Sequence, residues 1–220
     1  MRDKYQNKGF NKVLNKLRAE KILKYAKGKE CLEAGCGEGQ IAKYLSQQFE
    51  QLDVIDVDET LIQYVPKSKN IKIVCSSIEE FNPGKTYDMV VCTNVLEHVD
   101  KPVEVLKQMK TWGNNDTIYF FSVPNALSIN RIIGVDIGML DYPEQLGPHD
   151  IDAGHKRFYN LRTLTKHINE ADFSIIERGS MVYKPLPNEL MNKLPNSVLK
   201  KCLGMPVFLH GAELYVVARL

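Results

Sequence analysis

The sequence predicts an α/β fold with a doubly wound, mostly parallel sheet, an antiparallel edge strand, helices on both faces and a lid insertion. Three observations predict this fold. Short apolar runs alternate with segments of helical period, which is typical of parallel strands joined by helical crossovers. A glycine-rich turn follows the first apolar run. The chain of 220 residues is long enough for one sizeable α/β domain.

The first half of the chain supplies the alternating elements. Apolar residues at mostly helical spacing predict a leading helix within residues 10–27. Five strands are expected, at residues 30–35, 52–57, 71–76, 87–94 and 117–123. Helices are expected between several of them, at residues 39–48, 59–65 and 102–112. Asp100 and Pro102 are typical of the start of the last of these helices.

The pattern changes after the fifth strand. Residues 124–160 contain many prolines and glycines and one weakly helical stretch at 126–140. A connection of this length in a compact domain is often a functional lid. A helix at 161–170, a strand at 172–179, an irregular insert at 182–210 and a strand at 213–220 follow. The last two strands are expected to pair antiparallel at the edge of the sheet.

We therefore expect a single domain over residues 1–220. Its predicted parts are an N-terminal helical cap at 1–27, a cofactor-binding core at 28–123, a substrate lid at 124–160 and a C-terminal sheet edge at 161–220. The insert at 182–210 belongs to the last part. Its helical pieces are typical of a hydrophobic cover, and a dimer surface or a weak membrane contact are alternatives.

Composition excludes some functions and suggests a compartment. The net charge of +2 gives no electrostatic footprint for nucleic acid. The N-terminus is polar, and no apolar run has the length of a membrane span. The five cysteines form no paired C-x-x-C pattern, and we interpret Cys31, Cys75 and Cys92 as reduced core residues. A cytoplasmic protein without membrane insertion is expected.

The glycine-rich turn lies within CLEAGCGEGQIAKYL, residues 31–45. Gly35, Gly37 and Gly39 stand at alternate positions after the first strand. This is neither the G-x-G-x-x-G dinucleotide fingerprint nor a loop with the Gly-Lys-Ser/Thr ending of nucleoside triphosphatases. In a doubly wound sheet, ligands bind at the carboxyl ends of strands. The turn therefore predicts a ligand site, with a plain tight turn as the alternative.

Acidic residues narrow the choice of ligand. Glu33 precedes the first glycine and Glu38 lies inside the turn. Carboxylates repel a pyrophosphate and attract an ammonium group. Asp56, at the end of the second strand, can accept hydrogen bonds from both ribose hydroxyls, and Asp58 competes for that role. The turn thus suits a cationic, phosphate-free nucleoside such as S-adenosylmethionine.

At this point the sequence resembles the class I S-adenosylmethionine-dependent methyltransferases. ECLEAGCGEGQIAKYL and DVIDVDETLI resemble their first two motifs. YDMVVCTNVLEHVDKPVEVLKQM and GHKRFYNLRTLTKHINEADFSII resemble the branch with ubiquinone-biosynthesis O-methyltransferases and many sugar methyltransferases. The resemblance covers residues 28–125 and 154–180. It implies a Rossmann-like fold, S-adenosylmethionine as cofactor and S-adenosylhomocysteine as product.

The resemblance also implies the cofactor-binding residues. The amino-acid end of the cofactor would lie against Glu33, Gly35, Cys36, Gly37 and Gly39. The ribose would lie against Asp56 and Val57, the adenine against Ser77 and Ile78, and the methyl-donor region beside Thr93 and Asn94. Two residues depart from the family pattern. Ser77 stands where many relatives have Asp, and Asp172 stands where relatives usually have Gly.

The lid carries the candidates for acceptor chemistry. Within LGPHDIDAGHKRFYN, His149 and His155 are candidate bases near neutral pH, and His149 is favoured. Lys156, Arg157 and Tyr159 are expected to bind the acceptor, the first two suiting a phosphate or another acid. Two alternatives remain open. His155 and Arg157 could pin the lid to the sheet. The acids and histidines from His149 to His155 could bind a divalent metal, but their spacing matches no template, so no metal site is expected.

Glu97 and His98, in the run VLEHV, resemble an acid–base pair. We favour the interpretation that they order the loop after the fourth strand and the helix that follows, with Glu97 facing the pocket as the alternative. His167 and His210 are taken as structural.

The leading hypothesis is a methyltransferase that acts on an oxygen or nitrogen of a small polar metabolite. By resemblance, a sugar, a nucleotide-linked sugar or a phosphoramidate-type precursor of surface polysaccharide, such as a capsule, is favoured. A quinone or phenol O-methyltransferase and a non-catalytic S-adenosylmethionine-binding protein are the alternatives. A methyltransferase acting on tRNA or protein is disfavoured, because the chain has no basic stripe and the fourth strand ends in TNVL rather than in N-P-P-Y/F, which is expected of many amino-directed nucleic-acid enzymes. A homodimer is compatible with the sequence.

Overall fold

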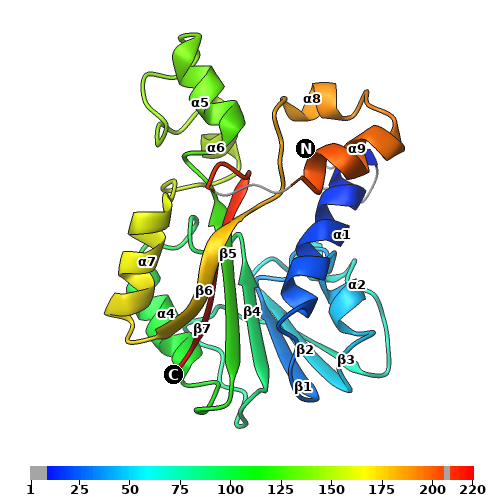
Figure 1. Ribbon diagram of the computed structural model, residues 1–220. Coiled ribbons are helices and arrows are strands. Elements are labelled where there is room, and N and C mark those ends of the chain that lie inside the picture. The colour runs from blue at the N-terminus through cyan, green and yellow to red at the C-terminus, as the bar shows by residue number, and fades with distance from the viewer. Residues whose placement is uncertain (1–8, 206–208) are drawn as a thin grey trace.

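The computed structural model describes residues 9–205 and 209–220. The first eight residues of the predicted N-terminal cap and residues 206–208 of the predicted insert lie outside this range. Within the described residues, a seven-stranded sheet forms the centre of the molecule (Figure 1). Its strand order is β3-β2-β1-β4-β5-β7-β6. The strands are β1 Glu30–Ala34, β2 Gln51–Asp56, β3 Ile71–Cys75, β4 Met89–Thr93, β5 Ile118–Pro124, β6 Ser174–Met181 and β7 Glu213–Arg219.

The predicted fold class is confirmed. Strands β1 to β5 pair in parallel, and β7 runs antiparallel to both β5 and β6. The antiparallel strand lies one place in from the edge, with β6 outermost. Burial explains this order, because six of the seven residues of β7 are buried whereas most of β6 is not. The more apolar strand takes the interior position.

Helices cover both faces of the sheet, as predicted (Figure 1). One face carries α4 (Pro102–Lys110) and α7 (Leu161–Glu170), whose buried side chains join one apolar core. The other face carries α1 (Gly9–Leu23) and α2 (Ala42–Leu45), which join a second core together with α9 (Asn196–Leu203), the helix packed against α1. Helix α3 (Glu59–Ile62) follows β2. Central strands are buried on both sides, so β4 is apolar at four of five positions.

One predicted core residue is exposed. Cys31 and Cys92 are buried, but Cys75 is exposed. The reason is the place of its strand, since β3 is the outermost strand beside β2 and none of its five residues is buried. The prediction that Cys75 belongs to the core is therefore wrong.

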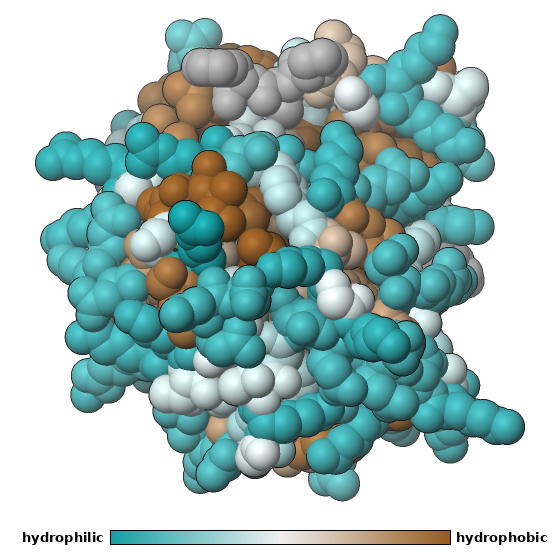
Figure 2. All heavy atoms as spheres, turned by 60° about the horizontal axis from the view of Figure 1, so that its bottom comes forward, coloured by the Kyte–Doolittle hydropathy of each residue, from teal (hydrophilic) through white to brown (hydrophobic). Residues whose placement is uncertain are grey.

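Four short helices stand at the carboxyl ends of the parallel strands (Figure 1). The predicted lid contains α5 (Ile129–Asp136) and α6 (Pro148–Asp152). The predicted insert at 182–210 contains α8 (Asn188–Met191) and α9, which packs against α1. In the parts of the chain that the structure describes, no helix combines the length and apolar character needed to cross a membrane. Figure 2 brings the opposite end forward, where the surface is mostly hydrophilic with a few separate apolar areas.

A polar cluster ties α1 to the antiparallel end of the sheet. The Tyr215 hydroxyl donates a hydrogen bond of 2.6 Å to Glu177, and Lys21 Nζ lies 3.2 Å from the same carboxylate. Lys21 also lies 4.0 Å from the centre of the Tyr215 ring. Hydrogen bonds from Tyr215 and from Tyr25 lower the pKa of Glu177 to about 2.

This pKa predicts a dependence of stability on pH. An acid whose pKa is lower in the folded state stabilises the fold above its unfolded pKa of about 4.3, and this stabilisation is lost as pH falls through about 2. Because the Glu177 side chain is 45% exposed, solvent screening limits the effect to about 1 kcal/mol. Urea unfolding should show wild type more stable than Glu177→Gln at pH 6, with the difference vanishing near pH 2. A difference that is constant over this range would contradict the assignment.

Candidate active site at the carboxyl ends of the strands

The glycine turn lies at the switch point of the sheet. Strand order reverses between β1 and β4, which lie side by side. The turn follows β1, and Asn94 follows β4. Ligands of doubly wound folds bind in the crevice at this point.

Each glycine of the turn has a positive φ, but the surroundings of the three differ. A Cβ on Gly35 would stand 2.2 Å from Val95, and one on Gly39 would stand 2.9 Å from Val65 and Pro66. These two glycines therefore allow close packing of the turn against the protein. A Cβ on Gly37 would meet no atom of the described residues within 4 Å. The open side of the turn is thus at Gly37, where a ligand can approach the backbone.

Glu33, on β1, is a buried acid with unused hydrogen-bonding capacity. Its side chain is 1% exposed, and one carboxylate oxygen has no hydrogen-bond partner among the described residues. Burial and the nearby charge of Asp56 raise the pKa of Glu33 to about 8, while Arg18 opposes the rise. A cation bound beside Glu33 would lower that pKa again. This environment suits the ammonium group of a ligand.

Asp56 and Asp58 have separate roles. The Asp56 carboxylate accepts hydrogen bonds from the Gly37 amide at 2.7 Å and the Asp58 amide at 3.0 Å. It therefore holds the glycine turn and the end of β2 together. Asp58 accepts hydrogen bonds from the amide and hydroxyl of Thr60 and is the N-cap of α3. Of the two competing acids, Asp56 is the one that faces the turn.

Three neighbouring residues form the region where an adenine is expected. Val57 leaves 68% of its surface exposed, which is unusual for an apolar residue at the end of a central strand. Ile78 is buried, and the Ser77 hydroxyl accepts a hydrogen bond of 3.2 Å from the Glu80 amide. The exposed apolar surface of Val57 is available to a flat, apolar ring.

Asn94 turns the chain sharply after β4. It adopts a φ of 54°, a left-handed conformation that Asn tolerates better than most residues. Its backbone amide donates to Ser122, and its side-chain oxygen is buried without a hydrogen-bond partner among the described residues. Thr93, the last residue of β4, is also buried. Asn94 lines a cavity, and the next residue, Val95, packs against Gly35 of the glycine turn.

This cavity has a volume of about 330 Å³ and is formed by α1, the β4 turn, the lid and the insert. Its lining is rich in charged and ionisable side chains. These are Arg18, Glu97, His98, His149, Asp150, His155, Lys184 and Glu213. A larger hollow of about 560 Å³ at residues 79–86 and 108–112 contains no predicted site residue.

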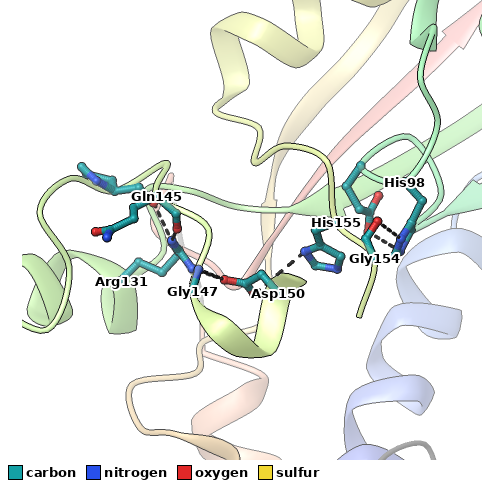
Figure 3. Close-up of polar contacts among 9 residues, drawn as sticks. His98, Arg131, Gln145, Gly147, Asp150, Gly154 and His155 are labelled. Atoms are coloured by element: carbon teal, nitrogen blue, oxygen red, sulfur yellow. Dashed lines mark hydrogen bonds and ion pairs between the residues drawn. The ribbon is translucent and has the colours of Figure 1, made fainter. Parts of the chain in front are cut away.

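The lid brings both candidate bases to this cavity. His149 and His155 line it together with Asp150. Figure 3 shows Asp150 between Arg131 and His155. The Asp150 carboxylate accepts a hydrogen bond of 2.9 Å from the Gly147 amide and lies 3.5 Å from Arg131. The network fixes Asp150 beside His155, with 3.9 Å between Oδ1 and Nδ1.

Three residues predicted to bind the acceptor lie elsewhere. Arg157 donates hydrogen bonds to the carbonyls of Leu96, Val99 and Asp100. Lys156 pairs with the Asp100 carboxylate at 2.5 Å. Tyr159 is 1% exposed, and its hydroxyl contacts the Leu96 carbonyl and His167. None of the three lines the cavity, because the chain uses them to fasten the lid to the β4 turn.

Glu97 and His98 behave differently from one another. His98 orders the lid through a contact of 3.1 Å between Nδ1 and the Gly154 carbonyl. Glu97 is fully buried, and neither carboxylate oxygen has a hydrogen-bond partner among the described residues. Burial, with repulsion from Glu213, raises the pKa of Glu97 to about 8. Burial also lowers the pKa of His98 and His155, so both imidazoles are neutral near pH 7.

A protein-family comparison decides the class of this site. Residues 5–178 match the family described as methyltransferase domain. The chain belongs to the methyltransferase domain family. It is a class I S-adenosylmethionine-dependent methyltransferase, with S-adenosylmethionine as cofactor and S-adenosylhomocysteine as product.

Curated relatives of this methyltransferase include ubiquinone biosynthesis O-methyltransferases. The protein of that name from Rickettsia felis is 26% identical over 195 residues, which cover 84% of this chain and 77% of the relative. The one from Vibrio campbellii is 26% identical over 79% of this chain and 77% of the relative. The homology is distant.

Solved structures share the fold. A Thermotoga maritima S-adenosylmethionine-dependent methyltransferase, described as a possible histamine N-methyltransferase, has a TM-score of 0.68 at 14% identity, covering 96% of this chain and 90% of that one. The N-methyltransferase NodS from Bradyrhizobium japonicum, in complex with S-adenosylhomocysteine, has a TM-score of 0.59 at 16% identity, covering 96% and 87%.

The residues around the glycine turn fit the cofactor. The unpaired carboxylate oxygen of Glu33 suits the ammonium group of the cofactor. The open backbone at Gly37 leaves room for a closely bound ligand. The exposed apolar surface of Val57 suits the adenine. Sequence reasoning missed the contributions of α1, the insert and the start of β7. Arg18, Lys184 and Glu213 line the cavity, but they come from segments far apart in the chain. No local pattern in the sequence indicates that these three residues lie together in the fold.

Proposed function

We propose that this methyltransferase acts on a hydroxyl or amino group of a small, polar and acidic metabolite. The observation that carries the proposal is the charged lining of the cavity beside the glycine turn. Buried charged groups are costly without a polar partner, and an apolar acceptor would leave the Glu97 carboxylate, which has no hydrogen-bond partner among the described residues, unpaired. Lys184 adds positive charge that suits a phosphate, whereas Arg18 is paired with Glu213. A sugar nucleotide or a phosphoramidate-type metabolite matches this chemistry.

The proposal names the acceptor by its chemistry. The expectation of a role in surface polysaccharide or capsule synthesis has no support in the structure or the relatives.

The residues of the site would bind the cofactor, orient the acceptor and remove a proton from it. Glu33, the glycine turn and Asp56 would hold the cofactor, which supplies an activated methyl group as a sulfonium. Asn94, at the boundary between turn and cavity, would position the acceptor against it. For a hydroxyl acceptor, His149 would accept the proton and pass it to water. Closing the lid would exclude water from the cavity.

His149→Ala should lower kcat by about 100-fold and leave the dissociation constant of S-adenosylmethionine unchanged, because a positioned general base contributes about that factor. Steady-state kinetics with the acceptor and calorimetry with the cofactor would measure both quantities. His210→Ala is the matched control, since His210 contacts the Leu127 carbonyl outside the cavity. An unchanged kcat would exclude His149 as the base.

The function is tested by incubating the protein with methyl-labelled S-adenosylmethionine and three groups of acceptors. These groups are sugar nucleotides, phosphorylated small metabolites, and catechol-like quinone precursors. Label in a polar, phosphate-bearing product supports the proposal. Label only in the phenols contradicts it. Cofactor binding without any transfer would favour a non-catalytic binding protein.

The second candidate is a quinone or phenol O-methyltransferase. Two observations favour it: the names of the 26% identical relatives, and exposed apolar residues on the lid. The latter are Leu127, Ile133, Ile137, Met139, Tyr142 and Ile151. Such a surface could rest on a membrane that holds a greasy acceptor. Clear co-sedimentation with liposomes would favour this candidate over the polar acceptor.

A further inference from the structure

A second feature of the cavity is a group of one carboxylate and two imidazoles. Glu97 and His98 come from the turn after β4, and His155 comes from the end of the lid. One potential ligand atom from each residue lies within 4.8 Å of the others. The two imidazole rings meet edge to face, with 4.8 Å between their centres. The three side chains are therefore close enough to share one ion.

The backbone fixes this arrangement. The Lys156 amide donates a hydrogen bond of 2.8 Å to the Glu97 carbonyl, which joins the lid to the turn at the site itself. His98 Nδ1 contacts the Gly154 carbonyl at 3.1 Å (Figure 3), so its Nε2 is directed to Glu97 Oε1, 3.9 Å away. A second contact that orients one nitrogen and leaves the other available is typical of metal-binding histidines.

The Glu97 carboxylate lacks the partner that its burial requires. It is fully buried, and neither oxygen makes a hydrogen bond to a described residue. The nearby cation Arg18 is committed to Glu213, with 2.9 Å between Nε and Oε2. An unpaired buried carboxylate is strongly unfavourable, and coordination of a cation is one way to satisfy it.

We propose that Glu97, His98 and His155 bind a divalent transition-metal ion in the acceptor cavity. Imidazole together with carboxylate suits ions such as Zn²⁺ rather than Mg²⁺ or Ca²⁺. Ligand bonds to Zn²⁺ are about 2.0–2.2 Å long, so side-chain movements of about 1 Å would close the three residues on an ion. Asp150, 3.9 Å from His155 Nδ1, would orient that imidazole from behind.

Three protein ligands leave coordination positions open. In the cavity these positions would take two oxygen atoms of the acceptor, such as neighbouring hydroxyls or a hydroxyl and a phosphate oxygen. The ion would fix the acceptor and make its hydroxyl more acidic. This role rests on the proposed function, whereas the binding site itself does not.

The test is a titration of the metal-free, untagged protein with Co²⁺, followed by visible absorption and calorimetry without cofactor or acceptor. We expect one Co²⁺ per chain and binding at least about 100-fold weaker in Glu97→Gln and in His155→Gln. His167→Gln is the matched control, because His167 is a half-buried histidine that contacts Tyr159 outside the cavity. Cys75→Ser controls for the exposed thiol. Both controls should bind as wild type does.

Two results would overturn the proposal. The first is no saturable binding up to about 1 mM Co²⁺, which would mean a binding free energy weaker than about 4 kcal/mol. The second is equal binding of Co²⁺ by wild type and by Glu97→Gln. Loss of binding in Cys75→Ser would equally overturn it. Calorimetry with S-adenosylmethionine checks that each variant is folded, and His155→Gln carries the test if Glu97→Gln does not fold. Because no acceptor is present, failure of this test and failure of the proposed function are distinguishable.

Discussion

Asp56→Ala should weaken the binding of S-adenosylmethionine by about 100-fold or more. Hydrogen bonds to a charged group contribute about 1.5–3 kcal/mol each, and the substitution removes two that a ribose would donate. It also removes the acceptor of the Gly37 amide, so the glycine turn loses a contact that shapes it. Calorimetric titration of the two proteins with S-adenosylhomocysteine would measure the change.

Asp58→Ala is the matched control for this result. It removes a carboxylate of the same size only two residues away, which caps α3 and accepts hydrogen bonds from Thr60. We expect a small loss of thermal stability and unchanged cofactor affinity. Normal affinity in Asp56→Ala, or an equal loss in both variants, would show that Asp56 is not the ribose-binding acid.

Glu213→Ala should destabilise the protein by about 3–5 kcal/mol. Glu213, at the start of β7, forms a two-armed ion pair with Arg18 of α1, and both side chains are nearly buried. Burial lowers the pKa of Arg18 and the attraction of Glu213 more than offsets this, so the guanidinium stays charged. Removing one partner leaves an unpaired buried charge, which is the reason for the large effect. Urea unfolding at pH 7 would measure it.

The double variant Arg18→Met with Glu213→Leu separates pairing from packing. Replacing a buried ion pair with apolar residues of similar size is often neutral or stabilising, so this variant should recover most of the lost stability. It should nevertheless lose turnover, since both residues line the cavity. A loss of less than about 1 kcal/mol in Glu213→Ala would mean that water replaces the missing partner.

The fold could be predicted from the sequence because its signals are local. Apolar runs and helical periods fix strand and helix positions within a few residues, and the alternation of the two requires a parallel sheet. The departure from the family pattern at Asp172, where relatives usually have Gly, also has a local explanation in the backbone. This residue adopts a φ of 58°, a conformation that glycine takes without strain and that Asp tolerates. The glycine usual in relatives is thereby explained.

Candidate cofactor residues could also be proposed from the sequence, since they lie at or just after the carboxyl ends of β1, β2, β3 and β4. The carboxyl ends of neighbouring parallel strands meet at one edge of the sheet, so residues at those ends must come together. Sequence spacing could not separate Asp56 from Asp58, because both lie at the end of the same strand. Their separate hydrogen-bond partners were needed for that choice.

The acceptor cavity is the part that only the tertiary structure decided. The sequence by itself determined the class of enzyme, the sheet and the glycine turn. It also predicted Lys156, Arg157 and Tyr159 as acceptor ligands, whereas the structure uses them to fasten the lid. Arg18 meets Glu213, and Glu97 meets His155, only after the sheet and both insertions are assembled. Side-chain direction and long-range contact depend on packing, which no local pattern in the sequence encodes.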